Sequence, residues 1–247
     1  MKVALITGAS RGIGAATARL AAGRGYTVVV NYVANRAAAE QVVADIAAGG
    51  GTAVAIQADV STEADVSRMF AEVDRRFGRL DALVNNAGIT ARAARVEDID
   101  VTRFQRIFAV NVTGPFLCSR AAIRRMSTAR GGGGGAIVNV SSKASRFGSP
   151  NEYVDYAASK AALETFTIGL AKEVAADGIR VNAVLPGVTD TEIHTFTGDA
   201  SRLERFARII PMKRIGRPDE IARAILWLLS DDASYATGTL MDVTGGL

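Results

Sequence analysis

The most constraining feature of this chain is the regular alternation of short apolar runs with longer amphipathic stretches. The runs are rich in Val, Ile and Ala and stand at Val3–Ile6, Thr27–Asn31, Ala53–Gln57, Ala82–Val84, Ala136–Val140, Val181–Leu185 and Thr239–Val243. They lack strict apolar–polar alternation, which is typical of parallel strands covered by helices on both faces. Helices are predicted between them, at Gly12–Arg24, Arg36–Ala48, Ser61–Phe77, Val101–Met126, Tyr156–Ala176 and Asp219–Leu229. The pattern predicts an α/β fold, a doubly wound parallel sheet of about seven strands with helices on both faces.

The alternation runs through the whole chain without a linker or a shift of composition. We therefore expect residues 1–247 to form a single domain. Residues Thr189–Arg217 fit the alternation poorly and form the longest irregular stretch. Such a segment in a compact domain is often functional, and we predict a lid over a substrate site there.

Composition excludes several classes of protein. The chain has one cysteine, Cys118, and one histidine, His194, so neither an internal disulfide framework nor a cysteine–histidine zinc site is expected. A net charge of +4 is too small to indicate nucleic-acid binding. No apolar run is long enough to cross a membrane and the first residues do not resemble a signal peptide, so we expect a cytoplasmic protein.

A glycine-rich segment, Thr7-Gly8-Ala9-Ser10-Arg11-Gly12-Ile13-Gly14, joins the first predicted strand to the first helix. Glycines let the backbone turn tightly and approach a ligand, and the start of a helix attracts phosphate. The spacing differs from the common Gly-x-Gly-x-x-Gly fingerprint, so a purely structural turn is the alternative. Its place in the first βαβ unit favours a Rossmann-type dinucleotide site formed by Gly8, Ser10, Arg11, Gly12, Ile13 and Gly14.

The end of the second predicted strand bears on the choice of dinucleotide. NAD sites commonly place a carboxylate there for the ribose hydroxyls, but this chain has Asn31 and Tyr32. Arg36 and Arg11 are nearby cations that suit the 2′-phosphate of NADP. We therefore predict NADP, with NAD less favoured; the alternative is that both arginines are ordinary surface residues.

Tyr156 and Lys160 are four residues apart and share one face of a predicted helix. A nearby ammonium favours the phenolate and brings a tyrosine toward useful acid–base chemistry. Ser142 follows a predicted strand, at the edge where open α/β sheets bind ligands, and could hydrogen-bond a carbonyl oxygen. The neighbouring Ser141 and the nearby Tyr153, which has Ala157 instead of a lysine four residues on, are less suitable.

Taken together, these residues resemble the short-chain dehydrogenases/reductases. The matching motifs are Thr7–Gly14, Asn85-Asn86-Ala87-Gly88, Asn111, Ser142, Tyr156 with Lys160, Pro186-Gly187 and the closing Asp242–Gly246. The likeness covers essentially the whole chain and is greatest to the branch that contains 3-oxoacyl-[acyl-carrier-protein] reductases and glucose 1-dehydrogenases. Two features depart from the simplest pattern, a slightly longer Ser142–Tyr156 interval and Lys143 directly after the serine.

The resemblance implies roles for individual residues. Tyr156 would be the acid/base, Lys160 would activate it and hold the nicotinamide ribose, Ser142 would orient the substrate carbonyl, and Asn111 would anchor a proton relay. Further cofactor contacts would come from Asp59 and Val60 at the adenine, from Asn85, Ala87 and Gly88 near the adenosine ribose, and from Pro186, Gly187, Thr189 and Thr191 at the nicotinamide end. The resemblance also implies a homotetramer.

We therefore predict an NADP(H)-dependent oxidoreductase that interconverts a ketone and a secondary alcohol, with a 3-oxoacyl thioester as the favoured substrate. A sugar or polyol dehydrogenase is the nearest alternative, and a non-catalytic dinucleotide sensor is an alternative of another class. Two groups of arginines, Arg75, Arg76 and Arg79, and Arg202, Arg205 and Arg208, could bind an acidic partner such as acyl carrier protein or could simply be solvated.

Overall fold

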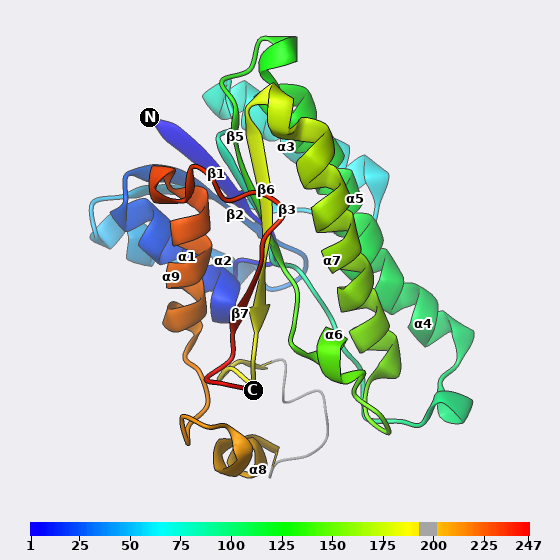
Figure 1. Cartoon of the computed structure of the whole chain (residues 1–247). Helices are drawn as coiled ribbons and strands as arrows, with labels where there is room; N and C mark the ends of the chain where they lie inside the picture. Colours follow the sequence, from blue (N-terminus) through cyan, green and yellow to red (C-terminus); the bar gives the residue numbers. More distant parts are fainter. Residues whose placement is uncertain (193–201) are drawn as a thin grey trace.

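The computed structural model describes residues 1–192 and 202–247. It contains one parallel sheet with the strand order β3-β2-β1-β4-β5-β6-β7 (Figure 1). The strands are β1 (Lys2–Ile6), β2 (Tyr26–Tyr32), β3 (Thr52–Gln57), β4 (Ala82–Asn85), β5 (Gly135–Val140), β6 (Ile179–Pro186) and β7 (Leu240–Val243). The order reverses between β1 and β4, which creates the crevice where such sheets bind ligands. The predicted fold class is confirmed.

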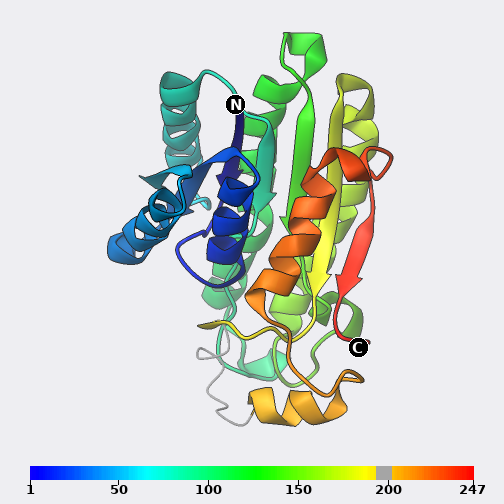
Figure 2. The same ribbon diagram turned by 90° about the vertical axis from the view of Figure 1, so that its left-hand side faces the viewer.

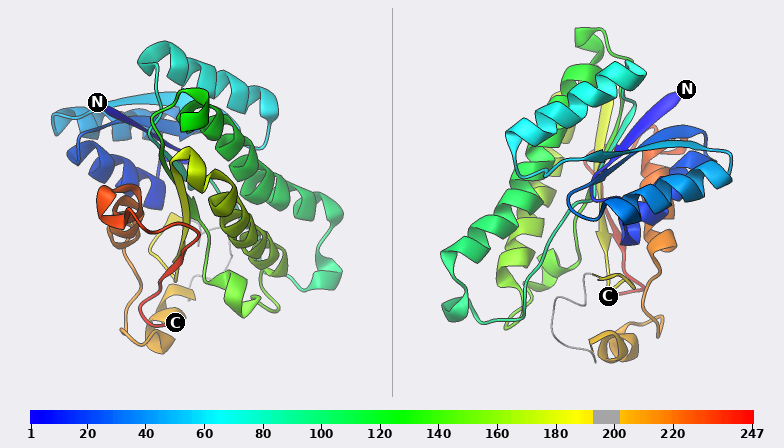
Figure 3. Two further views of the ribbon diagram at one scale, coloured as in Figure 1. Left: turned by 45° about the horizontal axis from the view of Figure 1, so that its top comes forward. Right: turned by 180° about the vertical axis from the view of Figure 1, so that it is seen from behind.

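Helices cover both faces of the sheet. One face carries α1 (Gly12–Gly23), α2 (Arg36–Ala48) and α9 (Pro218–Leu229), which Figure 2 shows in front of the strands. The other carries α3 (Glu63–Phe77), α5 (Gly114–Met126) and α7 (Val154–Val174), and Figure 3 shows the sheet between the two layers. The carboxyl edge of the sheet bears α6 (Ala144–Phe147) and α8 (Arg202–Ile209). Short 3-10 turns lie at Val96–Asp98, Thr128–Arg130, Ala175–Asp177 and Asp231–Ala233.

The apolar strands hold these layers together because successive side chains of a strand point to opposite faces. In β1, Val3 and Leu5 belong to the core beneath α3, α5 and α7, whereas Ala4 and Ile6 belong to the core beneath α1, α2 and α9. Both cores therefore need apolar residues at every position of the central strands. This explains the continuous runs in the sequence.

The predicted helix Val101–Met126 is interrupted in the structure. It consists of α4 (Val101–Phe108), a π-helical segment (Ala109–Thr113) and α5. Gly114 donates its N–H to the carbonyl of Ala109, five residues back. Pro115 has no N–H and cannot donate to the carbonyl of Asn111, so the α-helical ladder must break at this point.

The segment predicted as an irregular lid is also more ordered than expected. It contains α8, whose residues Leu203, Phe206 and Ala207 are half-buried along one face, followed by the buried Ile210. The apolar repeat of about two turns is too short to recognise reliably in a charged sequence. The remainder of the predicted lid, residues 193–201 with His194, lies outside the described residues.

Over the described ranges, none of the helices combines the length and the apolar character that a bilayer crossing requires.

Candidate active site

The glycine-rich turn has the geometry of a phosphate-binding turn. Gly8 and Gly12 have φ angles of +60° and +53°, a region that favours glycine. A Cβ on Gly14 would lie 2.6 Å from the carbonyl oxygen of Gly8 and 2.5 Å from Nδ2 of Asn86. Arg11 precedes α1 without a side-chain cap from any described residue, so the first N–H groups of this helix are suited to an anion. The turn thus fits the pyrophosphate of a dinucleotide.

Arg11 lies at the rim of a surface depression beside this turn. Ser10, Gly12, Asp190 and Thr191 also line the depression. The guanidinium of Arg11 donates to Glu192 over 2.8 Å, and both side chains are exposed. Such exposed ion pairs contribute at most about 1 kcal/mol, so Arg11 can exchange this carboxylate for a phosphate at small cost.

The two residues at the end of β2 that are predicted to contact the cofactor, Asn31 and Tyr32, are both buried. Asn31 is buried: its Oδ1 accepts from the N–H of Gly8 over 3.1 Å, and its Nδ2 donates to the carbonyl of Ala58 over 3.1 Å. Its side chain therefore braces the glycine-rich turn against the end of β3. Tyr32 is also buried, while Arg36 is exposed and donates to Glu40 over 2.6 Å.

The predicted adenine and ribose contacts fall on both sides of the crevice. Asp59 is half-buried and accepts from Ser61 and from Arg106. Desolvation acts to raise the pKa of Asp59, but hydrogen bonds from Ser61 and the nearby Arg106 guanidinium outweigh it and lower the pKa. Val60 packs against Gly114, where a Cβ would lie 2.9 Å from its Cγ2.

At the end of β4, the side chain of Asn85 points into the molecule. Its Nδ2 donates to Asn139 over 2.8 Å and to Ser119 over 3.0 Å, while Oδ1 is buried without a hydrogen-bond partner in the described part of the chain. Ala87 instead meets the glycine-rich turn, with its Cα 3.0 Å from the position of a Cβ on Gly8. Only the main chain of Asn85 is left to contact a ligand in this arrangement.

Lys160, Asn111 and Gly88 come together at the carboxyl edge of the sheet. The buried ammonium of Lys160 donates to the carbonyl of Val140 over 2.7 Å and lies 5.6 Å from the centre of the Tyr156 ring. A Cβ on Gly88 would be 3.3 Å from Lys160 Nζ and 3.5 Å from Asn111 Oδ1. Burial lowers the pKa of Lys160 to about 8, against the opposing effect of Glu164.

The π-helical segment places Asn111 in this group. Its Oδ1 accepts from the N–H of Ile89 over 2.9 Å, and its Nδ2 donates to the carbonyl of Ile89 and to Ser159, each over 3.0 Å. Asn111 is fully buried and fixes the segment after β4 to α7.

The two adjacent serines have different surroundings in the structure. Ser142 is half-buried at the end of β5, and its hydroxyl accepts from the N–H of Ala144 over 3.2 Å. Ser141 is buried and its hydroxyl lies 2.8 Å from a carboxylate oxygen of Glu164. Tyr153 is buried where α7 begins.

The segment predicted at the nicotinamide end follows β6 and borders the same crevice. The carbonyl of Pro186 accepts from the N–H of Lys143 over 2.9 Å, and a Cβ on Gly187 would be 2.8 Å from the Cα of Thr244. Thr189 is buried and Thr191 approaches the Cβ position of Gly12 to 3.3 Å. The Ser142 segment and the glycine-rich turn thus meet the two ends of this segment.

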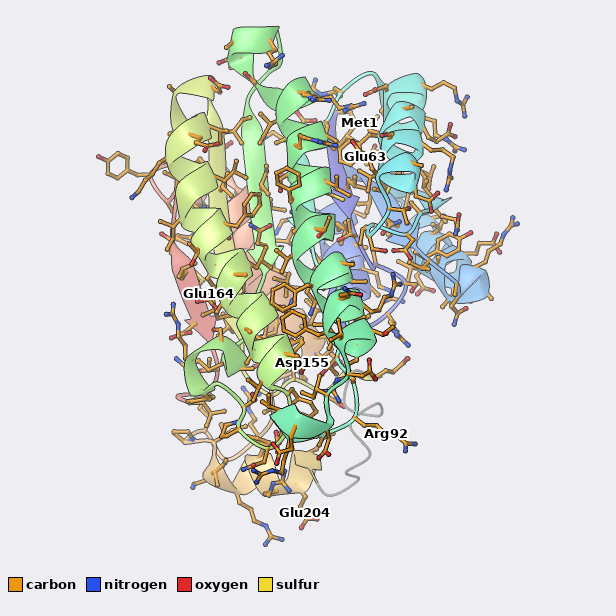
Figure 4. All side chains as sticks on the ribbon, turned by 90° about the vertical axis from the view of Figure 1, so that its right-hand side faces the viewer. Met1, Glu63, Arg92, Asp155, Glu164 and Glu204 are labelled. Carbon is orange, nitrogen blue, oxygen red and sulfur yellow. The ribbon has the colours of Figure 1, made fainter. Side chains whose placement is uncertain are left out.

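Two buried carboxylates were missed in the sequence, Asp155 and Glu164, and Figure 4 labels both on α7. Asp155 pairs with both sides of the Arg103 guanidinium, at 2.7 and 3.2 Å, and so fastens α4 to the turn that carries Tyr156. The signal for Glu164 was its place four residues after Lys160 on the same helix face.

Comparisons with known proteins identify the family of the chain. Residues 8–247 match the protein family described as enoyl-(acyl carrier protein) reductase. A short-chain type dehydrogenase/reductase from Mycobacterium marinum superposes with a TM-score of 0.93 at 37% identity, covering 99% of this chain and 94% of that one. The chain belongs to the short-chain dehydrogenase/reductase family.

Named relatives define the class of activity. An uncharacterised oxidoreductase of Escherichia coli K12 is 54% identical over 246 residues and covers both chains completely. The 3-oxoacyl-[acyl-carrier-protein] reductase of a Synechocystis strain is 40% identical, over 100% of this chain and 96% of its own. Glucose 1-dehydrogenase 2 of Bacillus subtilis is 37% identical, over 100% and 94%. The chain is thus an oxidoreductase of a family that uses nicotinamide dinucleotides, and the predictions of family and enzyme class are confirmed.

Proposed function

We propose that this oxidoreductase interconverts a ketone and a secondary alcohol with NADP(H), and that its favoured substrates are 3-oxoacyl thioesters. The observation that carries the proposal is the buried ammonium of Lys160 beside the Tyr156 ring at the carboxyl edge of the sheet. A cation is costly to bury, and its retention beside a phenol indicates a chemical role.

Each residue of the proposed site has a separate role in such a reaction. The nicotinamide, when bound, supplies or accepts the hydride. Tyr156 gives a proton to the carbonyl oxygen in reduction and takes it back in oxidation, while the charge of Lys160 stabilises the phenolate that remains. Ser142 orients the carbonyl by a hydrogen bond, and Asn111 holds the surrounding segments in place.

The proposed preference for NADP is supported by the charges near the adenosine end of the predicted cofactor site. No carboxylate stands among Asn31, Tyr32 and Val33 at the end of β2. Arg11 forms an exposed ion pair with Glu192, and Arg36 forms one with Glu40. A phosphate can replace such an exposed carboxylate at small cost.

The proposal of an acyl substrate is supported by the named relatives and not by a docking surface for acyl carrier protein. Arg75 and Arg76 pair with Glu72, Arg79 pairs with Asp81, and Arg205 and Arg208 pair with Glu152 and Glu204. These ion pairs reduce the positive field that an acidic partner would meet. A free thioester is therefore a sufficient substrate in this proposal. The single domain, the lid, the tetramer and the cytoplasmic location stay predictions.

The proposal is tested by a steady-state screen with NADPH against acetoacetyl thioesters and with NADP against glucose and other polyols. We expect reduction of the thioesters, and we expect Tyr156→Phe to lower kcat at least about 100-fold because the proton donor is lost.

Fluorescence titration provides the control, because Tyr156→Phe should still bind NADPH. Activity confined to sugars would replace the acyl substrate by the polyol alternative. Undiminished turnover in Tyr156→Phe would refute the assigned mechanism.

The cofactor is tested by dissociation constants. NADPH should bind more tightly than NADH, and Arg36→Ala should weaken NADPH binding about tenfold, the value of one charge-assisted contact, without changing NADH binding. Arg24→Ala, an exposed arginine after the far end of α1, is the matched control. Equal affinity for the two dinucleotides would overturn the preference.

A further inference from the structure

Glu164 is a charged residue that the proposed reaction does not use, yet only 4% of it is exposed. It lies one helical turn after Lys160 on α7, and both side chains are buried. Burying a carboxylate is unfavourable unless it is paired and hydrogen-bonded. Its partners therefore indicate what it does.

The partners of Glu164 stand on either side of Ser142. One carboxylate oxygen lies 2.8 Å from the hydroxyl of Ser141, the residue before Ser142 at the end of β5. The other lies 2.9 Å from the guanidinium of Arg146, in the short helix α6 that begins two residues after Ser142. One carboxylate thus fastens both flanks of Ser142 to the helix that carries Tyr156 and Lys160.

Glu164 supplies a negative charge that acts on the ammonium of Lys160. From α7, Lys160 meets the Tyr156 ring and Glu164, from β5 the carbonyl of Val140, and from the segment after β4 and the π-helical segment it meets Gly88 and Asn111. Burial lowers the pKa of Lys160, and the negative charge of Glu164 raises it again. Arg146 of α6 pairs with the same carboxylate and brings a positive charge to it.

We propose that Glu164 is a positioning residue, which ties the Ser142 segment to α7 and keeps a negative charge one helical turn from Lys160. The proposal rests on the proposed function, because it assigns Glu164 to the same site. The proposal differs from a merely structural role because it requires the charge of Glu164 to affect the titration of Lys160.

The test is a direct titration of Lys160 by NMR in protein labelled with [ε-13C]lysine, with Lys160→Met identifying the signal by its absence. Glu164→Gln keeps the shape and an acceptor for Ser141 but removes the charge. We expect the midpoint of Lys160 to move about 0.5–1 pH unit lower, the effect of one charge at this range in a protein interior. Arg146→Ala removes the opposing charge and should move the midpoint higher.

The opposite signs of these two shifts are the decisive result. Glu72→Gln is the matched control, because it removes a carboxylate that pairs with Arg75 and Arg76 on α3 and should leave the midpoint unchanged. A midpoint that stays within about 0.2 pH unit of the wild-type value in both Glu164→Gln and Arg146→Ala would overturn the proposal. If Glu164→Gln does not fold, the half-exposed Arg146 still permits the test, and an unchanged midpoint in Arg146→Ala overturns it alone.

A second readout separates this inference from the proposed function. In the reduction assay, the fall of kcat/KM at high pH reports the first proton lost from the coupled Tyr156 and Lys160, so it should follow the same shifts. Loss of activity in Tyr156→Phe together with unmoved Lys160 titrations would refute the role of Glu164 only. Undiminished turnover in Tyr156→Phe would refute the function whatever the titrations show.

Discussion

Replacing Gly14 by alanine tests whether the glycine-rich turn is as closely packed as the structure indicates. The new Cβ would lie 2.6 Å from the carbonyl oxygen of Gly8, 2.9 Å from the Cα of Ala9 and 2.5 Å from Asn86 Nδ2. Two of these neighbours are backbone atoms that cannot move aside, and overpacking of this kind costs about 1–3 kcal/mol. Asn86 would also give up its bonds to the carbonyls of Thr7 and Gly8, at about 1 kcal/mol each.

The gain in helix propensity, about 1 kcal/mol, offsets part of this cost. We therefore expect Gly14→Ala to lower the free energy of unfolding by about 2–4 kcal/mol, which corresponds to a fall in Tm of about 5–15 °C for a chain of this size. Because the displaced turn carries the N–H groups proposed to bind the cofactor phosphates, we expect the Kd for NADPH to rise at least about tenfold.

Gly23→Ala, at the other end of the same helix, is the control. Apart from its chain neighbours and the nearby backbone of the same helix, none of the described heavy atoms lies within 4 Å of its Cβ position. The substitution should therefore raise Tm by a few degrees at most. Calorimetry and fluorescence titration measure both effects. A Gly14→Ala protein with the wild-type Tm and NADPH affinity would show that the close contacts in this turn are wrong.

Two further predictions concern Lys160 and the face formed by α4, α5 and α7. The folded-state pKa of Lys160, about 8, lies below its ordinary value of 10.5, so the unfolded chain binds more protons between these values and the contribution of Lys160 to stability rises with pH there. Lys160→Met should consequently lose up to about 3 kcal/mol relative to wild type between about pH 8 and 10.5, and a pH-independent difference in urea unfolding would contradict this. Phe104, Phe116 and Ile168 leave exposed apolar surface on that face, so Phe116→Glu should convert the predicted tetramer to smaller species by light scattering. Tyr235→Glu, on a fully exposed side chain elsewhere, should not do so, and an unchanged mass for Phe116→Glu would count against this interface.

The sequence determined the architecture because the architecture depends on local patterns. Continuous apolar runs such as Val3–Ile6 are needed wherever a strand is covered on both faces, and the glycine-rich segment needs backbone angles that few other residues adopt. The motif residues Tyr156 and Lys160 were recognisable because their spacing of four residues matches a helical turn. The family, the sheet and the class of enzyme followed from these signals.

Other features depended on contacts between distant parts of the chain. The burial of Asn31 and Asn85 is decided by which backbone groups and side chains neighbouring strands present, and no local pattern shows this. The break at Asn111 could have been anticipated from Pro115, but its partners Ile89 and Ser159 could not.

The sequence by itself therefore determined the order of elements, the family and the class of enzyme, and it supplied the proposal for the residues that carry the chemistry. Only the tertiary structure decided the electrostatic surroundings of that chemistry, such as the carboxylate of Glu164 between Ser141 and Arg146. The physical reason is that periodicity and turn preference act within a few residues, whereas burial and charge pairing depend on groups that folding brings together from remote positions.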